Sequence, residues 1–350
     1  MNLLLSKASQ VLGSLRNKTR CLGYESSQKA VSRRWSKEAQ DERRLGRGFH
    51  WVESPLVLAQ INELISGDPG LDWANYVFRK YLLASGKGVE RGLSLGCGDG
   101  RIERHMRMLA ACHQIDAFDI AESAIAHARK RALESGIDGI IYQVRDLNDI
   151  KLPPNHYDVV VASSILHHIS NLEGLLDQVR SSLKPGGLLV ANEYVGPSQF
   201  QWTSKQVQII NEILSLLPEH YRRRVTDPHK VKDHISRPRI WWMNVRDPSE
   251  AIRSNEIVEM IERRFRIIER KDFGGTILHM LLQDIVWNFD PHDEHDGTIL
   301  KLVLYVEKVL IEEEVIPSDF TLIVAEKANQ QASFLEMDGL AAEVSVAASE

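Results

Sequence analysis

The chain has 350 residues, of which 43% are hydrophobic and 26% are charged, and its formal net charge is −5. These fractions are typical of a globular protein, and the mild negative charge excludes the strongly basic balance of a general nucleic-acid binder. No apolar run reaches the roughly 18 residues of a membrane span. The cysteines Cys21, Cys97 and Cys112 form no C-x-x-C pair, so we interpret them as free thiols of a reducing compartment and expect a cytoplasmic protein.

Residues 1–47 form a polar and basic segment that contains Arg33-Arg34 and Arg43-Arg44 and few acids. Such a segment is either a solvated lead-in or an arm for an anionic partner. We favour the lead-in, because the basic residues are not interleaved with aromatic ones as they are in nucleic-acid grooves.

Residues 48–90 show the apolar spacing of amphipathic helices, with a Gly-Asp-Pro-Gly turn at 67–70. We expect an N-terminal helical cap over one side of the core. Its aromatic residues Trp51, Trp73 and Tyr76 are interpreted as packing residues.

The stretch from Arg91 to Arg101 places three glycines in five residues directly after a short apolar run. Glycines in such a turn allow positive φ and let the backbone come close to a ligand. With a helix at 102–111, the stretch predicts the start of a nucleotide-binding βαβ unit. The next strand, 114–120, contains Asp119 about 20 residues beyond the glycines, where such folds place a ribose-binding carboxylate.

The rest of the chain alternates strand and helix, as parallel sheets with helical crossovers do. Further strands are expected at 140–144, 157–163, 188–193, 265–270 and 320–326. Further helices are expected at 121–134, 172–183, 202–217, 248–264, 277–289 and 299–316, with 220–246 irregular.

This pattern predicts an α/β fold with a doubly wound, mostly parallel, seven-stranded Rossmann-like sheet. One domain would span 91–327 and contain a helical lid insertion at 198–247, between the fifth and sixth strands. Residues 328–350, rich in Ala, Ser, Gln and Glu, are expected to form a disordered tail.

From Arg91 to about Lys327 the chain resembles the class I S-adenosylmethionine-dependent methyltransferases. The first motif has the form G-x-G-x-G, and Arg101 stands where a dinucleotide fingerprint has its third glycine, which argues against an NAD-linked oxidoreductase. The resemblance implies S-adenosylmethionine as the cofactor. The positions that match the family's cofactor-binding residues are Gly96, Cys97, Gly98, Gly100, Asp119, Ile120, Asp146, Leu147, Ala162 and Ser163.

Within this resemblance, Asp119 falls where the family binds the ribose hydroxyls and Asp146 where it contacts the adenine amino group. Each residue also has a purely structural interpretation, Asp119 as the cap of the next helix and Asp146 as a turn residue. Ser94 departs from the family pattern, because many members carry an acid there that takes part in orienting the cofactor's amino group.

A methyl group on a sulfonium is transferred by in-line displacement, and a hydroxyl acceptor must also lose its proton to a base. Candidate bases are expected beyond the carboxyl ends of the strands. His167 and His168 follow the fourth strand and Glu193 ends the fifth, so these three are the catalytic candidates, with His167 first. The alternative for the histidine pair is one packed ring and one solvent-facing ring.

Residues 220–246 are basic and aromatic, which suits a carbohydrate or an aromatic ring, with arginines for a phosphate or carboxylate on it. The alternative is a solvated helical lid whose Trp241 and Trp242 pack on the core. The combination of Trp51 with 66–68 and 72–73, 193–197 and 247–251 also resembles a bacterial methyltransferase subgroup associated with surface-polysaccharide and other glycan pathways.

The leading hypothesis is therefore O-methylation of a small-molecule or glycan hydroxyl. The alternatives are C- or N-methylation of a lipid, quinone or amine, and a protein that binds S-adenosylmethionine without transfer activity. Nucleic acid is not expected as a partner, and a monomer or homodimer is expected. We also expect no metal, because the ligand-type residues of 291–297 lie in a polar loop between helices.

Overall fold

The computed structural model describes residues 49–327. The predicted basic segment at 1–47, the predicted tail at 328–350 and Cys21 lie outside the described residues. Among residues 49–327, no helix is both long enough and apolar enough to cross a membrane.

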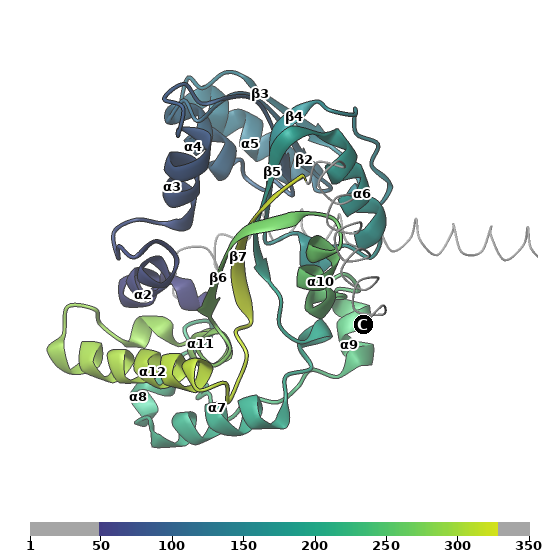
Figure 1. The fold of residues 1–350 in the computed structure, drawn as a ribbon. Coiled ribbons are helices and arrows are strands. Elements are labelled where there is room, and N and C mark those ends of the chain that lie inside the picture. Colours follow the sequence, from purple (N-terminus) through teal and green to yellow (C-terminus); the bar gives the residue numbers. More distant parts are fainter. Residues whose placement is uncertain (1–48, 328–350) are drawn as a thin grey trace, which may run out of the picture.

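A seven-stranded sheet in the order β3-β2-β1-β4-β5-β7-β6 organises the described chain (Figure 1). All neighbouring strands run parallel except β7, which is antiparallel to both β5 and β6. The predicted α/β class and the mostly parallel seven-stranded sheet are confirmed. The strands are β1 (Val89–Leu95), β2 (Cys112–Asp119), β3 (Ile140–Val144), β4 (Tyr157–Ser163), β5 (Leu183–Tyr194), β6 (Arg266–Gly274) and β7 (Phe320–Glu326).

The central strand β4 is buried on both faces, as its nearly continuous apolar sequence predicts. Val159 and Val161 belong to one large hydrophobic cluster, while Val160 and Ala162 belong to a second. Alternate side chains of a strand point to opposite faces, so the two clusters lie on the two sides of the sheet. The second cluster is covered by α6 (Leu172–Ser182) and α10 (Ile257–Glu262).

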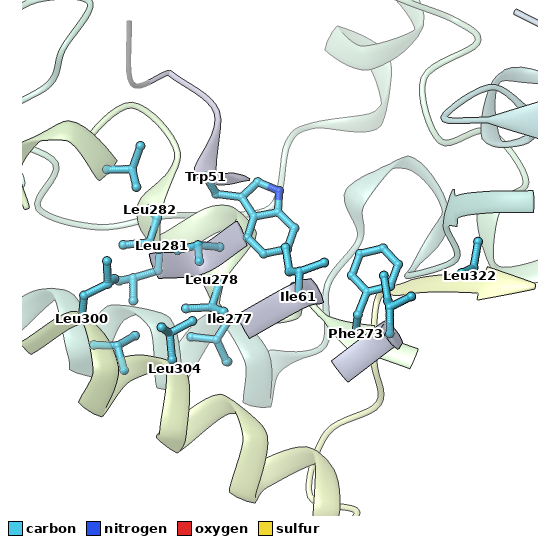
Figure 2. Packing of buried hydrophobic residues seen from close by; sticks show 14 of the residues in the cluster. Trp51, Ile61, Phe273, Ile277, Leu278, Leu281, Leu282, Leu300, Leu304 and Leu322 are labelled. Carbon is cyan, nitrogen blue, oxygen red and sulfur yellow. The ribbon is translucent and has the colours of Figure 1, made fainter. Parts of the chain in front are cut away.

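The first cluster is built largely by helices from the two ends of the described chain (Figure 2). Leu281 and Leu304 are buried there beside Phe273 of β6 and Leu322 of β7. Trp51 is 5% exposed, and its ring centroid lies 5.3 Å from that of Phe320, so it packs as predicted. The helices that contribute to this cluster include α2 (Pro55–Ser66), α3 (Trp73–Val77), α4 (Arg101–Met108), α11 (Leu278–Leu282) and α12 (Glu294–Glu312). Buried residues of α5 (Glu122–Glu134) form part of a smaller third cluster.

Between β5 and β6 the chain forms α7 (Ser204–Leu216), α8 (Glu219–Arg222) and α9 (Ile240–Arg246) before it reaches α10. In Figure 1, α7, α8, α11 and α12 lie at the bottom of the view, while α4 and α5 lie at the top beside β3. The stretch 220–246 was expected to be irregular throughout, and α9 corrects that expectation.

Two predicted helices are shorter than expected because tertiary contacts interrupt them. The helix predicted at 277–289 ends at Leu282, and Asp284 has a φ of 67°. The Asp284 carboxylate accepts hydrogen bonds from the backbone N–H and the hydroxyl of Thr226 at 2.9 and 2.8 Å. The helix predicted at 248–264 becomes a short 3-10 turn (Ser254–Glu256) followed by α10.

One predicted helix begins earlier than expected. The helix predicted from Ile299 begins at Glu294, because the Asp293 carboxylate caps the backbone N–H groups of His295 and Asp296. Residues 294–297 of the polar stretch 291–297 therefore form the first turn of α12 rather than a loop.

Candidate functional site

The glycine turn after β1 needs glycine for two separate reasons. Gly96, Gly98 and Gly100 all have positive φ, of 64°, 53° and 78°. A Cβ atom on Gly96 would lie 2.5 Å from Cγ1 of Ile165, so the loop after β4 approaches this backbone closely. A Cβ on Gly98 would meet no atom within 4 Å, which leaves open space on that side of the loop.

Asp119 ends β2 beside this turn and binds its backbone. One carboxylate oxygen accepts the Gly98 N–H at 2.9 Å, and the other accepts the Ala121 N–H, at the start of α5, at 2.8 Å. Burial raises the pKa of Asp119, although these backbone hydrogen bonds oppose the shift. Since each carboxylate oxygen has more than one acceptor site, the two bonds leave capacity for a hydroxyl donor. The ribose role of Asp119 and the adenine role of Ile120 beside it stay predictions.

Asp146 follows β3, the neighbour of β2 in the sheet. Its carboxylate accepts the N–H of Asn148 at 2.9 Å and so caps the short turn Leu147–Asp149. The turn interpretation is therefore observed, and the adenine contact stays a prediction. Leu147 is 5% exposed and packs in the second hydrophobic cluster.

The strands of the predicted cofactor site end at one edge of the sheet. Ala162 of β4 pairs with Leu95 of β1, just before the glycine turn. Ser163 lies one residue further, with its hydroxyl 3.4 Å from the side-chain nitrogen of Asn192 on β5. Cys97 is buried, and burial raises the pKa of its thiol far above the ordinary range, so the thiol stays neutral. The matched positions thus lie at or just beyond the carboxyl ends of β1, β2, β3 and β4, which are neighbours in the sheet, and their contact with a cofactor stays a prediction.

Glu193, at the end of β5, holds the loop after β4 in a fixed shape. It is 1% exposed. One carboxylate oxygen accepts the N–H groups of Ile165 and Leu166, both at 2.7 Å. The other oxygen lies 2.8 Å from Nδ1 of His167. Glu193 is therefore a positioning residue for His167 and for the turn that carries it.

The contact with Glu193 also fixes the tautomer of His167. An ionised carboxylate only accepts hydrogen bonds, so Nδ1 carries the proton and Nε2 is the acceptor of the neutral ring. Burial lowers the pKa of His167, but the hydrogen bond that His167 donates to Glu193 and the charges of Glu193, Glu250 and Asp247 outweigh it, so the pKa is raised.

Glu250 and Asp247 are functional candidates that the sequence reasoning did not single out. Oε1 of Glu250 lies 3.9 Å from Nε2 of His167, and the N–H of Ile252 donates to the His167 carbonyl at 3.0 Å. The segment 247–253 therefore packs directly on the histidine turn. The only signal was its membership in the 247–251 motif of the glycan-associated subgroup.

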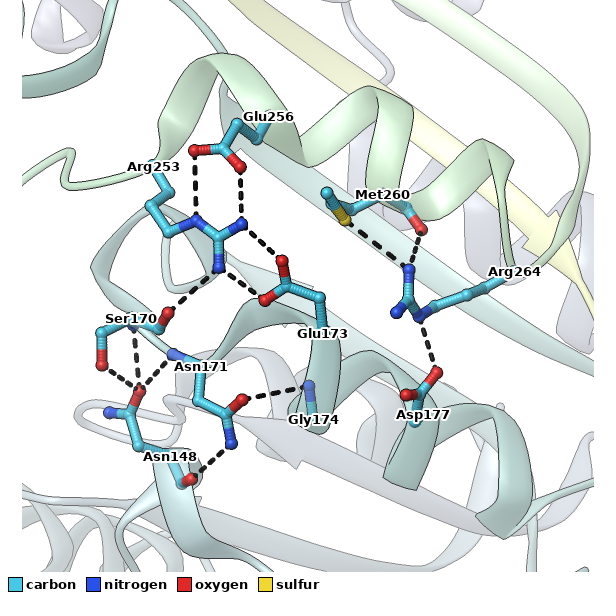
Figure 3. Close-up of polar contacts among 10 residues, drawn as sticks. All are labelled: Asn148, Ser170, Asn171, Glu173, Gly174, Asp177, Arg253, Glu256, Met260 and Arg264. Atoms are coloured by element: carbon cyan, nitrogen blue, oxygen red, sulfur yellow. Dashed lines mark hydrogen bonds and ion pairs between the residues drawn. The ribbon is translucent and has the colours of Figure 1, made fainter. Parts of the chain in front are cut away.

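An arginine network ties the 247–253 segment to the start of α6 (Figure 3). The Arg253 guanidinium binds both carboxylate oxygens of Glu173, at 2.5 and 2.6 Å, and the Ser170 carbonyl at 3.1 Å. It also binds Glu256. The hydrogen bonds from Arg253 lower the pKa of Glu173 to about 2, so this pair stays ionised at physiological pH.

His168 lies against His167, with ring centroids 4.2 Å apart. It is half-buried, and its Nδ1 is 3.4 Å from the Ser249 hydroxyl. His167, His168 and Glu250 each offer one metal-ligand atom, and these atoms lie within 4.8 Å of one another. Across residues 49–327 this is the one such group, so the polar stretch 291–297 does not form another.

A layer of aromatic rings continues from the histidine turn. Tyr194 lies between His167 and Phe200, with centroid distances of 6.2 and 5.2 Å, and Phe200 stacks on Trp202. His279 is buried in this layer, and burial lowers its pKa to about 3. Burial also raises the pKa of Tyr194, so the rings of Tyr194 and His279 are electrically neutral at physiological pH.

Part of the basic charge of 220–246 is paired with acids. Arg222, Arg223 and Arg224 pair with Asp233, Glu219 and Asp284 at 2.7, 2.6 and 3.2 Å. Trp241 and Trp242 are 61% and 41% exposed, which contradicts the alternative in which these tryptophans pack on the core.

Comparison with known proteins shows that part of this chain is similar to a known family. Residues 93–189 match the family described as a methyltransferase domain. A ubiquinone biosynthesis O-methyltransferase from Marinobacter nauticus is 27% identical over 167 residues, which cover 46% of this chain and 66% of that protein. A ubiquinone/menaquinone biosynthesis C-methyltransferase from Azotobacter vinelandii is 28% identical over 166 residues, covering 46% of this chain and 62% of that protein.

Among solved structures, an S-adenosylmethionine-dependent methyltransferase from Mesorhizobium loti matches at 18% identity with a TM-score of 0.42, covering 71% of this chain and 99% of that chain. The two curated relatives are each matched over less than two thirds of their own length. Residues 93–189 of this chain are therefore similar to a methyltransferase domain, a kind of enzyme domain whose cofactor is S-adenosylmethionine. The matched region contains the glycine turn, Asp119, Asp146 and His167.

Proposed function

We propose that this chain is an S-adenosylmethionine-dependent methyltransferase that acts on a hydroxyl of a small molecule or sugar. In this proposal His167 is the general base and Glu193 positions it. Residues 91–327 form the catalytic domain, 48–90 a helical cap and 198–247 the insertion that contacts the acceptor.

The observation that carries the proposal is the buried pair of Glu193 and His167. Because Nδ1 donates to Glu193 at 2.8 Å, Nε2 is the atom that can take a proton, and Glu193 then stabilises the imidazolium. This is the division of labour between carboxylate and imidazole in hydrolytic triads. A carbon or nitrogen acceptor needs less help from a base, so a built base supports a hydroxyl acceptor.

The cofactor supplies an electrophilic methyl group when it is bound. The protein's own part is to hold the cofactor at the glycine turn, to exclude water and to accept the acceptor's proton at Nε2 of His167. The open space beside Gly98 and the half-buried carboxylate of Asp119 fit a ligand with hydroxyl donors.

The test is methyl transfer from labelled S-adenosylmethionine to panels of sugars, phenols and amines by the whole chain. We expect a hydroxyl acceptor, and a His167→Ala rate reduced about 100-fold or more, with S-adenosylhomocysteine binding unchanged. His113→Ala, an exposed histidine on β2, is the matched control. A near-normal His167→Ala rate would overturn the base assignment.

The second candidate is a quinone-type acceptor, because one relative is named a ubiquinone biosynthesis O-methyltransferase and another a C-methyltransferase of ubiquinone and menaquinone biosynthesis. If a phenol is methylated and His167→Ala lowers that rate, the proposed acceptor narrows to a hydroxyl on an aromatic ring. If the methyl group is transferred to a ring carbon, the hydroxyl proposal is wrong. Cofactor binding with no acceptor in any panel or extract would favour the non-catalytic alternative.

We expect no metal requirement, although His167, His168 and Glu250 could hold an ion. A metal on Nε2 of His167 would remove the lone pair that the proton needs, so base and ligand are exclusive roles. Transfer rates measured with and without a strong chelator should agree. A rate lost to the chelator and restored by one divalent ion would replace the base by a metal site.

A further inference from the structure

A buried carboxylate without a partner lies close to the glycine turn. Glu103, in the first turn of α4, is 0% exposed. Among the described residues, no side chain or backbone group forms a regular hydrogen bond with either of its carboxylate oxygens. A buried polar group without a partner is unusual, and a buried charge is more so.

The neighbours of Glu103 place it against the turn rather than in the general core. The hydroxyl of Ser94 lies close enough to lower the pKa of Glu103 against the larger effect of burial. Burial raises the pKa of Cys97 and of Tyr142, and the Glu103 charge adds to both shifts. Ser94 belongs to β1 and is 3% exposed. Cys97 is in the turn itself, and the Tyr142 ring is the atom group nearest to a Cβ built on Gly100.

The charged groups that face Glu103 do not neutralise it. Arg104 donates to the Asp99 carbonyl at 2.5 Å, and Arg131 pairs with the Asp99 carboxylate at 2.5 Å. Within residues 49–327 no ion pair joins Glu103 to a cation. Burial is the largest influence on Glu103 and raises its pKa to about 7. A positively charged group of a ligand would therefore stabilise the ionised form of Glu103.

We propose that Glu103 supplies the negative charge that recognises the ammonium group at the methionyl end of the cofactor. The inference rests on the proposed function, because it takes S-adenosylmethionine as the ligand of the glycine turn. β1 carries Ser94 where many members of the family that the sequence resembles carry an acid, and the small buried hydroxyl leaves room for the carboxylate of α4 beside it. Glu103 is a positioning residue and takes no part in the transfer itself.

The proposal predicts a difference between two ligands that share the adenosine and thioether parts. S-adenosylhomocysteine has the ammonium group, and 5′-methylthioadenosine lacks it. Calorimetric titration of the whole chain should show Glu103→Gln binding S-adenosylhomocysteine at least about tenfold more weakly, since charged hydrogen-bond partners are worth that much. Binding of 5′-methylthioadenosine should change less than twofold.

A compensating variant tests whether the charge or the position matters. Ser94→Asp combined with Glu103→Gln returns a carboxylate to β1 and should recover most of the affinity for S-adenosylhomocysteine. If Glu103→Gln weakens the binding of both ligands equally, and the double variant recovers no affinity, Glu103 is only a packing residue. No weakening of either ligand would overturn the proposal outright.

A measurement on the unmodified chain keeps the inference testable even where a variant fails to fold. If the ammonium stabilises ionised Glu103, S-adenosylhomocysteine binding near pH 7 releases part of a proton, seen as a binding heat that depends on the buffer. Asp119 also has a raised pKa, but its proposed ribose partner is present in both ligands. A proton release equal for both ligands, or absent for both, contradicts the proposal. Failure of the unmodified chain to bind either ligand would instead sink the proposed function.

Discussion

Single side chains control the chemistry proposed for this site, and a substitution of Glu193 tests this most directly. In Glu193→Gln the amide oxygen can still accept the N–H groups of Ile165 and Leu166, but the amide nitrogen cannot accept from Nδ1 of His167. The ring then turns to the other tautomer and loses its acceptor at Nε2. We expect the transfer rate to fall by about 10²- to 10⁴-fold, with S-adenosylhomocysteine affinity unchanged.

The pH dependence follows from the same pair. Because the pKa of His167 is raised in the folded protein, the unmodified chain should gain rate as pH rises through a value above the ordinary 6.5. Steady-state transfer rates measured between pH 5 and 9 show where this rise in rate occurs. If the rate of Glu193→Gln rises at the same pH as that of the unmodified chain, the rise reports the titration of a group other than His167.

Glu103 links the proposed ligand site to stability. Burial raises its pKa from 4.5 to about 7, so the folded protein binds the proton more tightly than the unfolded chain does. The free energy of unfolding therefore falls as pH rises from 4.5 to 7, by on the order of 2 kcal/mol between pH 5 and pH 8. Burial also raises the pKa of Asp319 to about 7, so urea unfolding should show a smaller fall in Glu103→Gln than in the unmodified chain. An unchanged pH slope would mean that Glu103 titrates normally.

The residue scale also shows what the sequence could reveal. Asp119 was identified because its distance from the glycines is a property of the chain, and the structure places its carboxylate on the Gly98 N–H. Glu103 was missed, because an acid among Arg101, Arg104 and Arg107 has the pattern of a solvated helix face. Only the folded chain shows that this acid points inward.

At the scale of elements, one buried carboxylate organises the start of α11. Glu307 on α12 accepts the backbone N–H groups of Gly275, Ile277 and Leu278, at 2.8, 2.5 and 2.9 Å. Glu307→Ala would leave three buried donors unpaired, so we expect a loss of about 3 kcal/mol or more in the free energy of unfolding. Glu307→Gln keeps one acceptor and should lose less. Chemical denaturation compares the two, and equal losses would show that cavity formation dominates.

Element prediction succeeded where local signals and packing agree. Strands β3, β4 and β7 have the predicted bounds, because apolar runs of five to seven residues bounded by turns have little other choice. The helices predicted at 248–264 and 277–289 failed for a different reason. Their apolar spacing is helical, but contacts with distant residues, such as Asp284 with Thr226, override it, and these contacts have no local signature.

At the scale of the whole molecule, the glycine turn joins β1, β2 and β4, so a ligand bound there should stabilise the entire sheet. At a concentration of 100 times its dissociation constant, S-adenosylhomocysteine would add about 2.7 kcal/mol to the free energy of unfolding. We expect a thermal midpoint several degrees higher, measured by calorimetry. Asp119→Ala should lose most of this shift, and an unshifted midpoint for the unmodified chain would contradict cofactor binding.

The position of β7 has a consequence for the chain as it is being made. β7 is the last strand of the described chain, yet it lies between β5 and β6 in the sheet. While a ribosome is still adding residues 195–319, β6 has no neighbour to pair with, and the apolar sides of α11 and α12 have only part of their core. The first five strands can assemble early because their partners precede them, whereas the second half must wait with its unpaired strand exposed to other chains. Synthesis that stalls before Phe320 would therefore release an incomplete chain that is prone to aggregation. Chaperones would matter most in the short interval before β7 emerges from the ribosome.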